Sequence, residues 1–152
     1  MLDDATDVVL LMSRMLVGVA AQSLAATEDR ITLVQYRALV MLASLGEQNV
    51  GALAEELGIH GSTATRLCDR LLADGFIDRT TSQRSRREVT VALNAKGRAL
   101  VRAETARRRQ AIRDIVARLD EATQQQVIDA FGSLAGAADV GADHAWRLGW
   151  TA

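Results

Sequence analysis

The residues best suited to a chemical task lie in the middle of the chain, where arginines accumulate. Residues 61–109 hold twelve basic and five acidic residues, a net charge of +7, whereas residues 1–60 carry −5 and residues 110–152 carry −3. Clustered arginines attract polyanions and gain affinity by releasing counterions condensed on phosphate. The middle segment is therefore a candidate polyanion-binding region. A solvated charged surface would show the same charge pattern.

Two stretches of this segment combine guanidinium and hydroxyl groups. Over 62–73, apolar residues recur at helical spacing and are expected to face inward: Ala64, Leu67, Cys68, Leu71 and Leu72. The open face of the same predicted helix carries Ser62, Thr63, Thr65, Arg66 and Arg70. The stretch Thr80–Arg87 has no acid and carries Arg84, Arg86 and Arg87. Guanidinium groups contact phosphate and pair bidentately with guanine, and hydroxyls bond phosphate oxygens. The arginines at 107–109 are expected on a solvated helix face.

No comparable arrangement in the sequence suits catalysis or metal binding. Cys68 falls on the apolar side of the predicted helix and is expected to be a small buried hydrophobe rather than a redox sensor. His60 and His144 are too far apart for a zinc pattern, and no nucleophile has a neighbouring base. We therefore expect that the protein is not an enzyme, has no catalytic residues, and binds neither a metal nor a cofactor. A single cysteine fits a reducing, cytoplasmic location.

The elements around the first stretch predict how its side chains are presented. Asn49 is placed to cap a helix over 50–57, and Gly58 is placed to end it. A short turn then leads into the helix over 62–73. Two short helices joined by a tight glycine-containing turn follow the helix-turn-helix plan, in which the second helix enters the DNA major groove.

A hairpin and further helices complete the predicted fold. Strands over 76–79 and 88–93 enclose the second basic stretch, which forms the hairpin tip. The chain contains no proline and few aromatic residues, which favours helices. The additional helices are expected over about 7–26, from a capping box at Thr32 and Gln35 to Leu45, from 95 to about 118 after Asn94, and from 121 to about 138 after Asp120.

The apolar run over 8–21 predicts an amphipathic helix rather than a signal peptide or a membrane span. Three aspartates precede it, Asp3, Asp4 and Asp7, and Arg14 interrupts it. Secretory segments carry positive charge in front, and a spanning helix needs roughly 20 uninterrupted apolar residues. We therefore expect no membrane partner.

The segments resemble the MarR family, the multiple antibiotic resistance regulators, over nearly the whole chain. The resemblance implies a fold that is mostly α with a small β-hairpin wing, as one domain over 1–152. Its DNA-binding lobe would span about 32–94, and its dimerisation helices about 1–31 and 95–152. In two places the chain departs from the family pattern: Ser85 replaces the wing aspartate, and Asn94 replaces a threonine that can cap a helix equally well. The matching segments are Ile31–Leu39, Val50–Ile59, Ser62–Leu71, Asp74–Arg79 and Leu93–Arg98.

The family resemblance also implies a function and its residues. The protein would be a sequence-specific transcriptional regulator, a ligand-responsive repressor that binds double-stranded DNA as a homodimer on a pseudo-palindromic operator. A winged-helix protein-interaction module without DNA readout is the alternative. The implied DNA contacts are Ser62, Thr63, Thr65, Arg66, Arg70, Arg84, Arg86 and Arg87. A small apolar or aromatic effector would lie between the lobes, near Met12, Arg14, Met15, Tyr36, Arg37 and Ile115.

Overall fold

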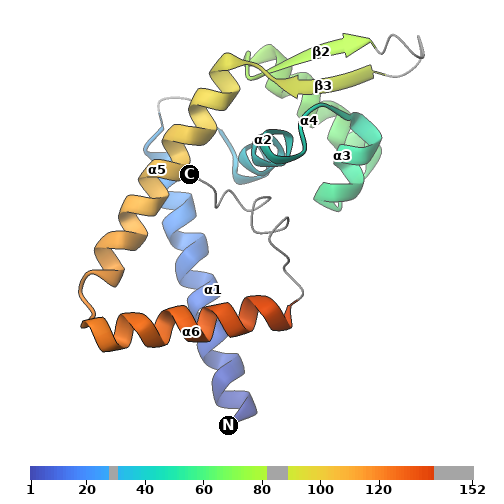
Figure 1. Cartoon of the computed structure of the whole chain (residues 1–152). Helices are drawn as coiled ribbons and strands as arrows, with labels where there is room; N and C mark the ends of the chain where they lie inside the picture. The colour runs from blue at the N-terminus through green and yellow to red at the C-terminus, as the bar shows by residue number, and fades with distance from the viewer. Residues whose placement is uncertain (28–30, 82–88, 139–152) are drawn as a thin grey trace.

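The computed structural model describes residues 1–27, 31–81 and 89–138, and these residues fold mainly as helices with a small antiparallel sheet (Figure 1). A long α5 runs from the sheet to the opposite end of the molecule, where α6 crosses α1 in this view. The order is α1 Leu2–Ala25, α2 Leu33–Leu45, β1 Gln48–Asn49, α3 Val50–Leu57, α4 Gly61–Ala73, β2 Ile77–Thr81, β3 Val89–Leu93, α5 Ala95–Val116 and α6 Glu121–Ala137.

Four helices, α2, α3, α5 and α6, begin at side-chain caps that the sequence predicts. The capping box of α2 is complete: the Thr32 N–H donates to Gln35 Oε1 at 2.8 Å, and the Gln35 N–H donates to Thr32 Oγ1 at 3.2 Å. Asn49 caps α3, Asn94 caps α5 and Asp120 caps α6, each accepting a backbone N–H three residues on. These bonds satisfy donors that have no partner within the helix, so the helix boundaries are encoded locally.

The sheet has three antiparallel strands in the order β1-β3-β2, one more than the sequence predicts. β2 and β3 form the expected hairpin, with Ile77 opposite Leu93. The additional strand, β1, has two residues, and its Gln48 pairs with Val91. A two-residue strand is too short to show an alternating pattern. β1 joins the helix-turn-helix segment to the hairpin through backbone hydrogen bonds.

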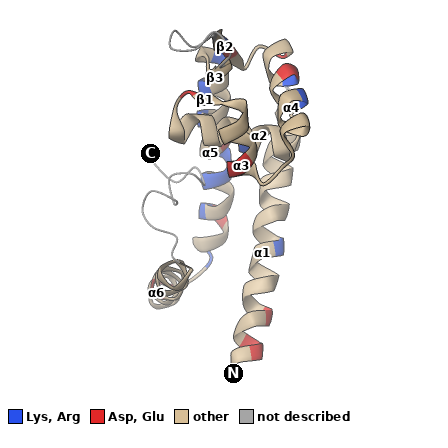
Figure 2. Cartoon of the chain, turned by 90° about the vertical axis from the view of Figure 1, so that its right-hand side faces the viewer, with Lys and Arg blue, Asp and Glu red and all other residues tan. Residues whose placement is uncertain are grey.

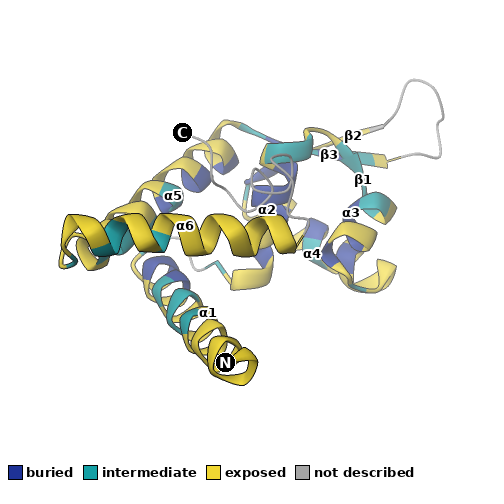
Figure 3. Cartoon of the chain, turned by 60° about the horizontal axis from the view of Figure 1, so that its bottom comes forward, coloured by how far each residue is buried: buried dark blue, intermediate teal, exposed yellow. Residues whose placement is uncertain are grey.

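The core is centred on α2, which is covered by the other elements of its lobe. Five consecutive residues over 38–42 are buried, so helices or strands lie on every side of this turn. Figure 3 shows the buried positions gathered on α2 and on the inner sides of its neighbours. The sequence places Leu72 inward, but its side chain is 37% exposed, because it lies at the edge of the apolar face of α4.

The start of α5 is packed tightly against the hairpin. A Cβ added at Gly97 would lie 2.2 Å from the Phe76 carbonyl oxygen and 2.9 Å from Leu93 Cδ2. Lys96 Nζ lies 4.3 Å from the centroid of the Phe76 ring, and the Asn94 side-chain amide donates to the Gly75 carbonyl at 2.9 Å. Asn94 therefore ties the hairpin to α5 through its Nδ2, while its Oδ1 caps the helix.

The outer parts of α1 and α6 carry apolar side chains that nothing in the described part of the chain covers. No described residue of α6 is buried, and Ile128 is 64% exposed (Figure 3). In α1 only the last turns, at Ala20, Ser23 and Leu24, enter the core. By length and mean hydropathy, α1 meets the criterion for a membrane-spanning helix, a criterion that core helices and signal sequences also meet. It begins at Leu2, about one turn and a half before the predicted start.

Candidate nucleic-acid interface

Helix α4 is amphipathic, and the packing of its apolar side turns its polar side towards solvent. Ala64, Cys68 and Leu71 are fully buried in the core. The opposite face presents the predicted DNA contacts of this helix, all of them exposed: Ser62, Thr63, Thr65, Arg66 and Arg70. Rotation of α4 about its axis would expose its three buried residues, so the register of the polar face is set by packing.

The approach to α4 is a tight turn that requires a glycine. Gly58 ends α3 with φ of +66°, in the left-handed region that residues with a Cβ rarely adopt. His60 precedes α4 in extended conformation, and its side chain makes no cap. α3 and α4 therefore meet in the arrangement expected of a helix-turn-helix.

Within the polar face, the hydroxyl and guanidinium groups differ in how they are held. The Thr65 hydroxyl donates to the Gly61 carbonyl at 2.9 Å, which leaves its oxygen lone pairs facing out as acceptors. Among the described residues, Arg66 and Arg70 form no ion pair. Within the described ranges, neither guanidinium group donates a hydrogen bond to another side chain or to the backbone.

An ion pair joins α4 to the hairpin. Arg79 on β2 donates to Asp69 on α4 at 2.6 Å, and the two side chains are 35% and 54% exposed. On the neighbouring strand, the Thr90 hydroxyl contacts the Glu47 carboxylate and lies 3.1 Å from the Thr80 carbonyl. The ion pair fixes the base of the wing relative to α4, and the Thr90 contacts join β3 to β2 and to the residue before β1. The tip, with Arg84, Arg86 and Arg87 and with Ser85, lies outside the described residues.

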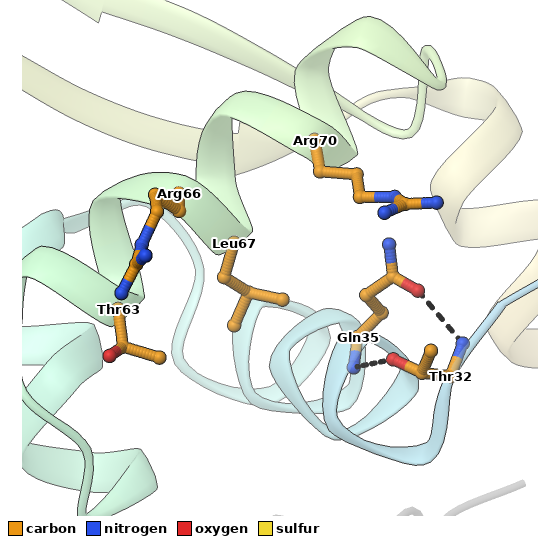
Figure 4. A pocket seen from close by; sticks show the side chains of 6 residues that line it. All are labelled: Thr32, Gln35, Thr63, Arg66, Leu67 and Arg70. Carbon is orange, nitrogen blue, oxygen red and sulfur yellow. Dashed lines mark hydrogen bonds between the residues drawn. The ribbon is translucent and has the colours of Figure 1, made fainter.

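A pocket opens between α4 and the N-terminus of α2 (Figure 4). Its volume is about 260 Å³, and it is lined by Thr32, Gln35, Thr63, Arg66, Leu67 and Arg70. None of these six residues is acidic. Figure 2 places α4 at the opposite end of the molecule from the acidic residues at the start of α1. The pocket thus shares its arginines with the polar face of α4.

Cys68 is fully buried on the inner side of α4, as predicted. Burial raises the pKa of its thiol, more than the nearby Arg79 lowers it. A thiol held protonated and covered reacts slowly with oxidants, since the thiolate is the nucleophile.

A buried charge cluster lies where α2 meets α5, and sequence reasoning missed it. Glu104 is fully buried and accepts from Arg107 at 2.9 Å, with Arg108 at 3.7 Å. The Arg108 guanidinium lies 5.1 Å from the centroid of the Tyr36 ring, and the Tyr36 hydroxyl lies 3.4 Å from Thr105 Oγ1. The expected solvated face is therefore wrong for Arg108. The signal available was Glu104 spaced three and four residues before two arginines.

The residues predicted to line an effector site are distributed over three helices. Tyr36 is buried beside α5, and burial raises the pKa of its hydroxyl. Arg37 faces α3 instead, where it donates to the Leu57 carbonyl at 3.5 Å. The pocket in Figure 4 is lined by none of the six. The remaining four are Met12 and Met15, both half-buried, and Arg14 and Ile115, both exposed.

Comparison with known proteins identifies this architecture. The MarR family model matches residues 31–89, from just before α2 to the first residue of β3. The structure of RV1404 from Mycobacterium tuberculosis superposes with a TM-score of 0.83 and 36% identity, covering 93% of this chain and 95% of that one. The chain belongs to the MarR family.

Two further proteins are similar to this chain in sequence or in fold. The HTH-type transcriptional regulator YfiV of Bacillus subtilis strain 168 is 33% identical over 72 residues, 47% of this chain and 45% of YfiV. A MepR variant from Staphylococcus aureus, solved bound to an oligodeoxyribonucleotide, has the same fold at 20% identity, with a TM-score of 0.68 and coverage of 88% and 97%. Membership of the MarR family groups this chain with transcription regulators.

Proposed function

We propose that this MarR protein is a homodimer that represses transcription by occupying a pseudo-palindromic operator, with one α4 in each of two successive major grooves. The observation that carries the proposal is the two-sided α4, whose polar face is held outward by three fully buried residues. The MepR variant bound to an oligodeoxyribonucleotide supports DNA as the partner of this fold.

In this proposal some exposed side chains contact DNA bases and others contact the DNA backbone. Arg66, near the middle of α4, contacts a base edge, since guanidinium pairs bidentately with guanine. Ser62, Thr63, Thr65 and Arg70 supply further contacts, mainly to phosphate and sugar. The wing arginines, Arg84, Arg86 and Arg87, contact the adjacent minor groove or its phosphates. The ion pair between Asp69 and Arg79 sets the distance between the two contact regions.

The homodimer forms through the uncovered apolar faces of α1 and α6. On α1, Leu10 and Val17 lie seven residues apart, on the same side of the helix, and are 48% and 57% exposed. On α6, Ile128, Phe131 and Leu134 are 64%, 45% and 42% exposed. Burying such faces against a second copy removes them from water, and a two-fold axis would pair each face with its equivalent. This gives the division into a DNA-binding lobe over 32–94 and dimerisation helices over 1–31 and 95–152.

The two-lobed arrangement also allows an effector to regulate DNA binding, and a role on DNA implies where in the cell the protein acts. A small apolar or aromatic effector bound between the lobes, near Met12, Met15 and Tyr36, would shift the spacing of the two α4 helices and release DNA. Arg14, Arg37 and Ile115 would complete its surroundings. The shift is limited by the difference in the effector's affinity for the two states. A regulator of this kind acts where the DNA is, in the cytoplasm.

The experiment that tests the function is selection of bound duplexes from a random DNA pool by the purified protein. The expected product is a pseudo-palindrome with half-site centres about 10 base pairs apart, because two α4 helices on one face of DNA are separated by about one helical turn. Recovery of random sequence alone would contradict specific readout. Failure to retain any duplex at low salt would favour the protein-interaction module.

A further inference from the structure

In the described part of the chain, the pocket between α2 and α4 contains a buried donor without an acceptor. Gln35 is 3% exposed, and its carboxamide is divided between two tasks. Its Oε1 accepts the Thr32 N–H in the capping box, which fixes the orientation of the amide. Its Nε2 is buried and has no hydrogen-bond partner among the described residues. A buried N–H without an acceptor costs free energy, so its retention points to a partner that arrives from outside.

The surroundings of Gln35 Nε2 add positive charge. Figure 4 shows this nitrogen directed towards the guanidinium of Arg70, which is also a donor. Arg66 and Thr63 lie on the other side of Leu67, and both also line the pocket. The pocket also lies at the N-terminus of the 13-residue α2, the positive end of its dipole. The missing partner is therefore an anion with several acceptor oxygens.

The size and the walls of the pocket favour a segment of nucleic-acid backbone. Its volume of about 260 Å³ is below the roughly 300–1,000 Å³ of pockets that hold drug-sized ligands, which suits a group of a few atoms. Leu67 and the aliphatic stems of the arginines give an apolar wall, against which a deoxyribose can pack. Because Arg66 and Thr63 also belong to the proposed reading face, a duplex lying along α4 passes directly over this opening.

We propose that the pocket binds one backbone phosphate of the DNA duplex, with Gln35 Nε2 and Arg70 as donors. This inference rests on the proposed function and adds to it a contact from α2, outside the helix-turn-helix. One such contact in each protomer anchors the strand beside the major groove and fixes how deeply α4 enters. Phosphate contacts of this kind position the protein and carry no base preference.

The variant Gln35→Glu separates phosphate binding by Gln35 Nε2 from helix capping by Gln35 Oε1. Glutamate at this position keeps the oxygen that accepts the Thr32 N–H, and it is a standard partner in a capping box. The substitution replaces the donor by an acidic oxygen, which repels phosphate and pairs with Arg70. Gln126→Glu on the exposed face of α6 makes the same change in charge far from α4 and is the matched control.

The experiment measures affinity for random-sequence duplexes at several salt concentrations, together with Tm, for wild type, both glutamate variants and Arg70→Met. We expect Gln35→Glu and Arg70→Met to bind at least about tenfold more weakly than Gln126→Glu. Their salt slopes should fall by about one for each phosphate that the variant no longer binds, about two for a dimer. Tm reports whether each variant keeps its fold, and Arg70→Met, at an exposed position, carries the binding comparison if the carboxylate buried at position 35 lowers Tm.

Inorganic phosphate at constant ionic strength distinguishes a free anion from DNA. If inorganic phosphate raises the Tm of wild type but not of Gln35→Glu, while both bind duplex equally, the pocket takes a free anion and the proposal is overturned. Equal duplex affinity and salt slope in Gln35→Glu and Gln126→Glu also overturns it. If the wild type binds no duplex, the proposed function itself fails, which is a different result from the loss of this one phosphate.

Discussion

Substitution of Gly97 by alanine tests whether α5 is locked to the DNA-binding lobe as closely as the packing indicates. The new Cβ would lie 2.2 Å from the Phe76 carbonyl oxygen and 2.9 Å from Leu93 Cδ2, so backbone has to move by about 1 Å to restore ordinary contact. Overpacking of this kind costs about 1–3 kcal/mol or more, whereas alanine gains at most about 1 kcal/mol in helix propensity. A net destabilisation of about 2 kcal/mol should lower Tm by roughly 4–8 °C.

The control is Gly61→Ala, because Gly61 also lies in the first turn of a helix, but a Cβ added there would have nothing within 4 Å. This variant should be as stable as wild type or slightly more stable. The measurement is urea unfolding followed by far-ultraviolet circular dichroism, which gives the free energy of unfolding of each variant. If Gly97→Ala is no less stable than Gly61→Ala, the close approach of α5 to the hairpin does not restrain the lobe.

Three further outcomes are expected. Asp69→Asn should weaken operator binding several-fold while changing the free energy of unfolding by less than about 1 kcal/mol, because the exposed pair with Arg79 positions the wing more than it stabilises the fold; unchanged operator affinity would refute this. Phe131→Asp should shift the sedimentation coefficient from dimer to monomer at micromolar concentration, since it places a charge in the apolar face of α6; a variant that remains dimeric excludes that face from the interface. Replacing Arg86 and Arg87 by alanine should weaken binding to operator and random DNA alike and flatten the salt slope; binding curves that superpose on wild type at every salt concentration would exclude the wing.

The parts of the fold that could be predicted are those encoded by neighbouring residues. The capping box at Thr32 and Gln35 and the glycine stop at Gly58 locate helix ends, because each depends on backbone groups within a few positions. The two-sided pattern of α4 likewise follows from helical spacing. DNA-facing candidates on α4 were identified because their exposure depends on that spacing alone.

The features that could not be predicted depend on partners distant in sequence. β1 exists because Gln48 and Asn49 meet β3, about forty residues later. The spacing of Glu104 and Arg108 indicates their pairing, but the cover that Tyr36 of α2 gives to Arg108 depends on a residue about seventy positions away. The Gln35 Nε2, which has no partner among the described residues, becomes notable only when α4 is placed beside the N-terminus of α2. Residues that serve in a cap can thus serve a second time in a site, and sequence reveals only the first role.

The central claim is that α4 reads base sequence, and the most direct measurement compares operator with random duplex for wild type and Arg66→Ala. Arg113→Ala, which removes the same charge from an exposed position near the far end of α5, is the control. Arg66→Ala should lose about 1–3 kcal/mol of binding free energy on the selected operator and much less on random DNA. The control should bind both duplexes like wild type. Equal losses on both duplexes, or no loss on the operator, would contradict base readout by Arg66.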